Sequence, residues 1–243
     1  MDSITENKLR IGNFTSSEIA ALMSTAKDGK SFGKPALTYI EEKNMERRLQ
    51  RSLDSESMAR PLSWGKLIEG RVFDLLGLEY SLTSTETLQH PTINCWTGSP
   101  DGTKIDTVID IKCPITLKSF CQLVDPIYHE FDTISIIRNE YTSGEKYYWQ
   151  LVSNAIITGA KFAELIVYVP YLGELSDIRT LANDYDGGDQ NKYAWIGFAD
   201  DNELPYIQNN GYYKNINIIR WEVSESDKEL LTERVLMASK LLI

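Results

Sequence analysis

One segment constrains the fold more than any other: residues 97–114, TGSPDGTKIDTVIDIKCP. In its second half, branched apolar side chains flank Asp110 on both sides, and this density predicts a strand that is half buried in a sheet. Asp110 and Lys112 are two residues apart, so their side chains lie on one face of that strand, while Ile111 points the other way, into the core. Other elements must therefore cover the apolar face.

The residues before this strand predict its partner. Residues 92–98 and 105–111 have strand patterns on either side of the turn SPDGTK, and we expect them to form an antiparallel pair. The plain alternative is a surface hairpin with solvated charges, because Asp101 lies in a Pro-Asp-Gly turn, where aspartate is an ordinary residue. The two interpretations differ in whether the charges at the strand ends meet in a site.

The rest of the chain predicts helices around this pair. Apolar residues at helical spacing predict helices over residues 13–25, 36–50, 62–77 and 144–158, and a closing helix capped by Ser226. Further strand patterns occupy residues 163–170 and 215–223. This order predicts a mixed α/β core. We expect a single domain over residues 1–243, with an irregular acidic insertion at residues 171–215, which are rich in Asp, Asn, Gly and Tyr.

Composition narrows the class of protein. The chain has no apolar run that approaches the ~20 residues of a membrane span, and its first residues lack the pattern of a secretory signal. Cys95, Cys113 and Cys121 form no CxxC pair, which argues against a disulfide framework and a structural zinc site. The chain has only two histidines, His90 and His129, which argues against a catalytic site built around histidine. We expect a cytoplasmic protein.

The charge of the chain does not settle its partner. A formal net charge of −10 is unusual for a protein that simply coats DNA, because its binding face would make the domain basic. Much of the acidic excess lies in residues 174–203, however, where Arg179 and Lys192 are the only cations. Carboxylates gathered around a divalent cation would also look excessive until the charge of the ion is counted.

The acids and the lysine of the central segment suit a divalent metal. Mg²⁺ prefers hard oxygen ligands, and carboxylates from two neighbouring strands and a nearby helix can supply them. Asp101 and Asp110 would lie on neighbouring strands, and the backbone carbonyl of Ile111 is a further candidate ligand. A lysine at the position of Lys112 can orient an attacking water or lower the energy of a hydroxide.

Four motifs occur in one order along the chain: W-G-x₃-E, S-P-D-G, D-x-K-C-P and Y-x₂-Q. Together with the N-terminal segment LRIGNFTSSEIAALM, this set resembles the lambda exonuclease or YqaJ-like viral recombinase family of PD-(D/E)XK nucleases. The resemblance covers residues 8–24 and 60–170. It implies a restriction-endonuclease-like core, in which helices flank a central mixed β-sheet.

Carried over residue by residue, the resemblance implies a catalytic set and a phosphate pocket. Asp101 would be the central metal ligand, Asp110 the second ligand, and Glu69 would complete the acidic set for one or two Mg²⁺ or Mn²⁺ ions. Lys112 would serve the attacking water, with Gln150 in support. The family also cradles a 5′-phosphate in one arginine and two serines, and the matching positions here are Arg10, Ser17 and Ser99.

Each of these positions also has a plain interpretation when taken alone. Glu69 could be the polar edge of an amphipathic helix, and Gln150 a surface residue of another. Arg10 could be a surface charge, and Ser17 an N-terminal helix residue. Asp110 departs from the family pattern, in which glutamate is the commoner residue. It is the co-occurrence of the motifs in one order that favours the catalytic interpretation.

The resemblance implies a phage-type recombination nuclease that works in a bacterial host cytoplasm. It would be a Mg²⁺-dependent 5′→3′ exonuclease that digests double-stranded DNA from a 5′-phosphorylated end and leaves 3′ single-strand tails. Family analogy adds a ring-shaped trimer and a single-strand annealing protein as partner. Two alternatives stay open: an endonuclease on the same core, and a non-catalytic protein that binds DNA ends or assembles on them.

Overall fold

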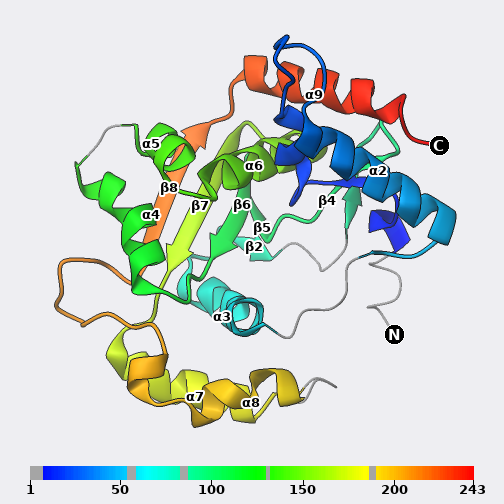
Figure 1. Ribbon diagram of the computed structural model, residues 1–243. Helices are drawn as coiled ribbons and strands as arrows, with labels where there is room; N and C mark the ends of the chain where they lie inside the picture. Colours follow the sequence, from blue (N-terminus) through cyan, green and yellow to red (C-terminus); the bar gives the residue numbers. More distant parts are fainter. Residues whose placement is uncertain (1–7, 54–58, 83–86, 130–131, 186–189) are drawn as a thin grey trace.

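The computed structural model describes residues 8–53, 59–82, 87–129, 132–185 and 190–243 (Figure 1). Its centre is a five-stranded sheet with the strand order β2-β5-β6-β7-β8. The strands are β2 (Ser81–Leu82), β5 (Gly102–Lys104), β6 (Thr107–Lys112), β7 (Phe162–Tyr168) and β8 (Ile216–Glu222). β6 and β7 run parallel, and the other pairs are antiparallel. The sheet is therefore mixed.

Helices cover both faces of this sheet. Beneath α6 (Gly144–Thr158), one apolar cluster joins alternate residues of the strands, including Val108 of β6. On the opposite face, a second cluster joins Ile109 and Ile111 to α3 (Arg60–Leu75). Figure 1 shows the sheet between these helices. The predicted fold class, a mixed sheet flanked by helices, is confirmed.

The remaining helices complete the layers. They are α2 (Lys34–Leu49), α4 (Leu117–His129), α5 (Thr133–Glu140), α7 (Leu175–Asn183), α8 (Gln190–Phe198) and α9 (Glu225–Ser239), with the 3₁₀ helices η1 (Ile19–Met23), η2 (Leu172–Glu174) and η3 (Asp201–Glu203). No helix among the described residues is long and apolar enough to cross a membrane. α9 is capped by Ser224, whose Oγ accepts a hydrogen bond from Asp227 N at 3.1 Å, and not by Ser226.

The predicted antiparallel pairing of residues 92–98 with 105–111 is wrong. β4 (Trp96–Gly98) belongs to a separate small sheet, between β1 (Phe14–Thr15) and β3 (Leu88–Gln89). β6 pairs instead with β5, through a two-residue turn at Ile105 and Asp106. Asp106 has a φ of 52°, the left-handed conformation that tight hairpins require and that aspartate tolerates. The SPDG turn therefore carries the chain from one sheet to the other.

The helix predicted over residues 13–25 is also shorter than expected. Its first residues form β1, where Ser16 N donates a hydrogen bond to Thr97 O at 2.9 Å, and only residues 19–23 turn into the 3₁₀ helix η1. Glu18 precedes η1 without a side-chain cap. The residues expected to form the first helical turn pair with β4 instead. Ser17 consequently lies between the strand and η1.

The segment 171–215 is not the irregular insertion that its composition predicts. It contains α7 and α8, whose apolar residues pack on α3; Ile178 and Ile196 are fully buried. The acidic residues Asp184 and Asp201 stay exposed. In Figure 1 the two helices lie on the far side of α3 from α6. The polar composition of the segment as a whole concealed two short helices, of which α7 has a clear apolar face.

In α2 polar side chains face inward beside the apolar Ala36, Tyr39 and Ile40. Leu37 and Leu49 are exposed, whereas Lys43 and Glu46 are buried. Glu46 accepts a hydrogen bond from Gly12 N at 2.8 Å and lies 2.9 Å from the Lys43 ammonium. This buried carboxylate ties the N-terminal segment to α2, since the backbone amide and the ammonium together satisfy it.

Candidate active site

The charged end of β6 lies beneath α6. Asp110 is fully buried, and its Oδ1 accepts a hydrogen bond from Gln150 Nε2 at 2.6 Å. Its Oδ2 lies 2.6 Å from Lys112 Nζ. Strand alternation places both residues on the face covered by α6, as predicted, with Ile111 in the opposite apolar cluster. The interpretation as a solvated surface hairpin is therefore wrong for this strand.

Asp101 meets β6 from the turn that precedes β5. Its Oδ2 accepts a hydrogen bond from Ile111 N at 2.6 Å. The N–H and the carbonyl of one strand residue point to the same side of the strand, so the carbonyl of Ile111 is also turned toward Asp101. The structure thus brings together the two carboxylates and the backbone group that were expected to share a site.

Glu69 completes the acidic group from α3. Burial, followed by the charges of Asp110 and Glu69, raises the pKa of Asp101 well above its usual range. Burial and the charge of Asp110 also raise the pKa of Glu69, against the nearby Lys112 and Lys66. Three carboxylates that repel one another in a partly desolvated place favour the binding of a cation.

The residues fit a hard divalent cation by their chemistry. Within the described part of the chain, no three His, Cys, Asp or Glu side chains converge in a metal-holding arrangement, and Lys112 supplies the positive charge beside Asp110. The buried Asp110 Oδ2 has the Lys112 ammonium, 2.6 Å away, as its partner. The side-chain ligands on offer are all carboxylate oxygens, which Mg²⁺ prefers. Asp101, Asp110 and Glu69 are the side chains that would hold such an ion.

Tyr147 is a site residue that the sequence reasoning did not assign. Its ring centroid lies 4.9 Å from Lys112 Nζ, so the ring faces the ammonium in a cation–π contact. Tyr147 precedes Gln150 by three residues, which puts both on one face of α6. The Y-x₂-Q motif already contained this spacing, and it was the available signal.

A small polar cavity of about 40 Å³ adjoins the carboxylates. The residues that line it are Arg10, Thr15, Ser16, Ser17, Thr87, Thr97, Gly98, Ser99 and Gln150. The three residues expected to bind a 5′-phosphate are therefore brought together, with Arg10 Nη2 3.3 Å from Ser17 Oγ. Gln150 both lines the cavity and donates to Asp110. The cavity and the acidic group are thus neighbours.

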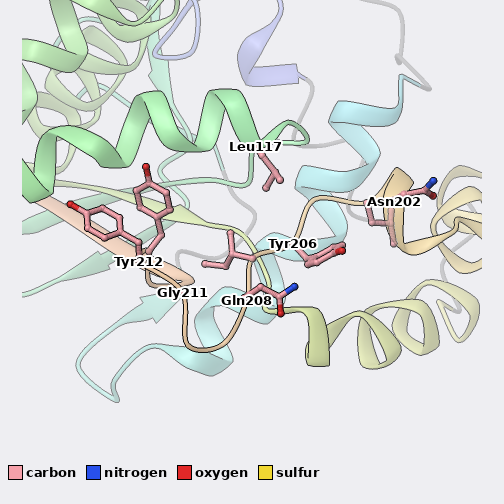
Figure 2. A pocket seen from close by; sticks show the side chains of 9 residues that line it. Leu117, Asn202, Tyr206, Gln208, Gly211 and Tyr212 are labelled. Carbon is pink, nitrogen blue, oxygen red and sulfur yellow. The ribbon is translucent and has the colours of Figure 1, made fainter.

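A larger hollow of about 450 Å³ lies between the start of α4 and the loop before β8 (Figure 2). Leu117, Tyr206 and Tyr212 are among its lining residues. No charged side chain is present among the described residues that line it. Its aromatic and apolar surface contrasts with the cavity at Arg10, where a guanidinium and several hydroxyls converge, so of these two the smaller cavity is the better match for a phosphate.

Gly98, which lines the small cavity, is packed too closely for a larger residue, and Gly98→Ala is expected to destabilise the protein by about 1–3 kcal/mol. A Cβ there would overlap Asn154 Oδ1 and would lie 2.5 Å from Ser16 Oγ. Urea unfolding measures the effect. Gly65→Ala in α3 is the matched control: its Cβ meets nothing within 4 Å, so alanine should stabilise the helix by about 0.5–1 kcal/mol. Equal stabilities for the two variants would contradict the tight packing at Gly98.

Comparison with known proteins places the chain in a family. The model of the YqaJ-like viral recombinase domain matches residues 7–161. No curated protein sequence matches the chain.

Three solved structures are similar in fold. LHK-Exo in complex with dAMP has 17% sequence identity and a TM-score of 0.60, over 98% of this chain and 92% of that one. The alkaline exonuclease LHK-Exo from Laribacter hongkongensis gives the same identity and coverage with a TM-score of 0.61. A phage-related exonuclease from Haemophilus somnus 129PT has 14% identity and a TM-score of 0.61, over 94% of this chain and 92% of that one.

Identities at this level establish the fold alone, and that fold is the one of phage-type alkaline exonucleases. The family rests on the domain match, which spans more than half of the residues, including Arg10, Glu69, Asp101, Asp110 and Gln150. The chain belongs to the YqaJ-like viral recombinase family.

Proposed function

We propose that this protein is a Mg²⁺-dependent 5′→3′ exonuclease that digests double-stranded DNA from a 5′-phosphorylated end and leaves 3′ single-strand tails. One observation carries the proposal: Gln150 donates to Asp110 and also lines the cavity that holds Arg10, Ser17 and Ser99. A terminal phosphate in that cavity would place the adjoining phosphodiester beside the carboxylates. An enzyme that holds the end of a strand in this way is an exonuclease.

Each side chain has a definite task in this proposal. Asp101, Asp110 and Glu69 would hold Mg²⁺, which supplies a Lewis acid that lowers the pKa of water and neutralises phosphate charge. Burial lowers the pKa of Lys112, but Asp110 and Asp101 raise it further, so the net shift is upward. Lys112 is consequently protonated and orients the attacking water by donating a hydrogen bond.

Two residues of α6 support this arrangement. Gln150 fixes the orientation of the Asp110 carboxylate through its 2.6 Å hydrogen bond. The ring of Tyr147 faces the ammonium of Lys112 at 4.9 Å and limits the positions that the flexible lysine can take.

The relatives support a nucleic-acid substrate. LHK-Exo shares the fold and has been solved with dAMP, a nucleotide of the size that a DNA exonuclease would release. Family likeness extends the proposal to a ring of three copies and to a single-strand annealing protein as partner. Both extensions are open to direct test by analytical ultracentrifugation and by co-purification.

Incubation with linear and covalently closed duplex DNA tests the proposal. With Mg²⁺, linear 5′-phosphorylated duplex should be degraded to nucleotides and 3′-tailed products, and the closed circle should remain intact because it offers no end. Addition of EDTA should stop the reaction. Cleavage of the circle would favour the endonuclease, and intact linear DNA in the presence of Mg²⁺ or Mn²⁺ would favour a non-catalytic end-binding protein.

A further inference from the structure

Ser17, one of the three serines that line the small cavity, has two polar neighbours. Arg10 Nη2 lies 3.3 Å from Ser17 Oγ, and Thr15 Oγ1 lies 3.2 Å from the same atom. A guanidinium can only donate hydrogen bonds, so Ser17 Oγ accepts from Arg10. A hydroxyl has two acceptor lone pairs and one proton. The direction of the Thr15 contact therefore decides where the Ser17 proton points.

Tyr39 of α2 determines that direction. Thr15 N donates a hydrogen bond to Tyr39 Oη at 2.8 Å, and Thr15 Oγ1 lies 3.4 Å from the same oxygen. The backbone amide can only donate, so the phenol accepts from it and has its own proton left to donate. Tyr39 is 5% exposed, and Thr15 Oγ1 is the hydroxyl within its reach. Burial raises the pKa of Tyr39, which keeps that proton in place.

The three hydroxyls thus form a directed chain. Tyr39 donates to Thr15 Oγ1, and the proton of Thr15 is then free to donate to Ser17 Oγ. Ser17 accepts from both Thr15 and Arg10, which uses both of its lone pairs. Its own proton must point elsewhere, and Ser17 lines the cavity. The cavity therefore presents a hydroxyl donor and a guanidinium to the same ligand.

We propose that the Tyr39–Thr15–Ser17 hydroxyl chain presets Ser17 as a donor and so gives the cavity its selectivity for a terminal phosphate over a terminal hydroxyl. This inference rests on the proposed function. A phosphate dianion offers only acceptors, so a preset donor binds it without first reorienting, whereas a terminal hydroxyl can serve as donor or acceptor and gains less. Tyr39 and Thr15 act through Ser17 and are positioning residues.

Tyr39→Phe tests the start of the chain. Initial rates on matched short duplexes, with a 5′-phosphate or a 5′-hydroxyl, are measured for the full-length enzyme with Mg²⁺. The phosphate-to-hydroxyl ratio of rates should fall about fivefold, the effect of one misdirected hydrogen bond. Tyr128→Phe is the control, because Tyr128 Oη also accepts from a backbone amide, that of Lys214, at 3.1 Å, but lies on α4. Its ratio should equal that of the wild type.

Two variants at Thr15 separate direction from packing. Thr15→Val keeps the shape and the backbone amide but removes the hydroxyl, so the ratio should fall as in Tyr39→Phe. Thr15→Ser restores the hydroxyl and should restore the ratio, which a packing role would not predict. Unfolding midpoints check that each variant is folded.

The possible outcomes distinguish the inference from the function on which it rests. A wild-type enzyme that digests both duplexes at one rate would overturn the proposed 5′-phosphate pocket and the inference with it. A wild-type preference that survives both Tyr39→Phe and Thr15→Val would overturn the inference alone.

Discussion

Asp110→Asn and Asp101→Asn are expected to abolish Mg²⁺-dependent hydrolysis alike, yet to change the free energy of unfolding in opposite directions. Each substitution removes a carboxylate proposed to hold the metal. Loss of several kcal/mol of charge stabilisation lowers the rate on the order of a thousandfold or more. Lys112→Ala should be similarly inactive, because the group that orients the water is gone. Nucleotide release from linear duplex DNA measures all three.

The difference in stability follows from the partners of each carboxylate. Asp110 is buried against the Lys112 ammonium at 2.6 Å, and asparagine would remove the carboxylate paired with that ammonium. We expect Asp110→Asn to lose about 1–3 kcal/mol. Replacing Asp101 by asparagine instead removes a charge that Asp110 and Glu69 repel. The asparagine side chain still offers an oxygen to Ile111 N. We expect Asp101→Asn to be more stable than the wild type in EDTA.

The pH dependence gives this prediction a further check. Burial and neighbouring charges raise the pKa of Asp101 in the folded state, so the ionised group weakens the fold as pH rises above its unfolded pKa. The advantage of Asp101→Asn should therefore be largest near neutral pH and should disappear in acid, where the wild-type carboxyl is protonated in both states. Urea unfolding at several pH values in EDTA measures it.

Asp106→Asn serves as the matched control, since Asp106 lies in the same hairpin, away from the charged end of β6, with a φ of 52° that asparagine tolerates. It should keep both activity and stability. If Asp101→Asn still digests DNA at the wild-type rate, the metal-binding assignment is wrong. If Asp110→Asn is as stable as the wild type, the ion pair with Lys112 contributes little to the fold.

Local periodicity predicted the elements that carry the site. The apolar spacing of residues 62–77 and 144–158 matches α3 and α6 to within a few residues, because each helix has one strongly apolar face on the sheet. The alternation of residues 107–112 placed Asp110 and Lys112 on one face of β6. These predictions depend on which side of an element is buried, and that information is local.

Strand pairings between segments that are far apart in the chain were harder to predict from the sequence. β4 pairs with β1, where Phe14 lies opposite Trp96, and with β3, where Leu88 lies opposite Gly98. Nothing in the sequence of residues 92–98 distinguishes these partners from β5 or β6. The burial of polar side chains on α2 could not be predicted for a similar reason. Glu46 is satisfied there by Gly12 and Leu53 from other segments, so the usual link between polarity and exposure does not hold.

The site residues also divide into those that the sequence predicted and those that depend on contacts between distant segments. The predicted acids and Arg10 could be found because their types and order match a family motif. The supporting hydroxyls could not, since Thr15 gains its role only from Tyr39, which lies on another element. Tyr147 was within reach from its spacing to Gln150, but its contact with Lys112 depends on how α6 crosses β6.

Arg10→Ala is expected to lower digestion of 5′-phosphorylated duplex by about ten- to a hundredfold, the value of a charge-assisted hydrogen bond. Digestion of 5′-hydroxyl duplex should change far less, because the terminal phosphate is the group that the guanidinium binds. Arg10 is exposed at the mouth of the cavity, 3.3 Å from Ser17, so the loss of packing should be small. Initial rates on the two matched duplexes measure the difference.

Two further substitutions identify what Arg10 contributes. Arg10→Lys keeps the charge but loses the planar fork, and its preference for phosphate should be intermediate. Arg48→Ala is the control, since Arg48 is an exposed arginine of α2 whose partner is Glu41, at 3.0 Å; its rates should match the wild type on both ends. A general contact with the DNA backbone would lower both rates by one factor, because an internal phosphodiester has no additional charge for Arg10 to recognise. A loss confined to the 5′-phosphorylated duplex would instead assign Arg10 to the terminal phosphate, and with it the direction in which the enzyme digests its substrate.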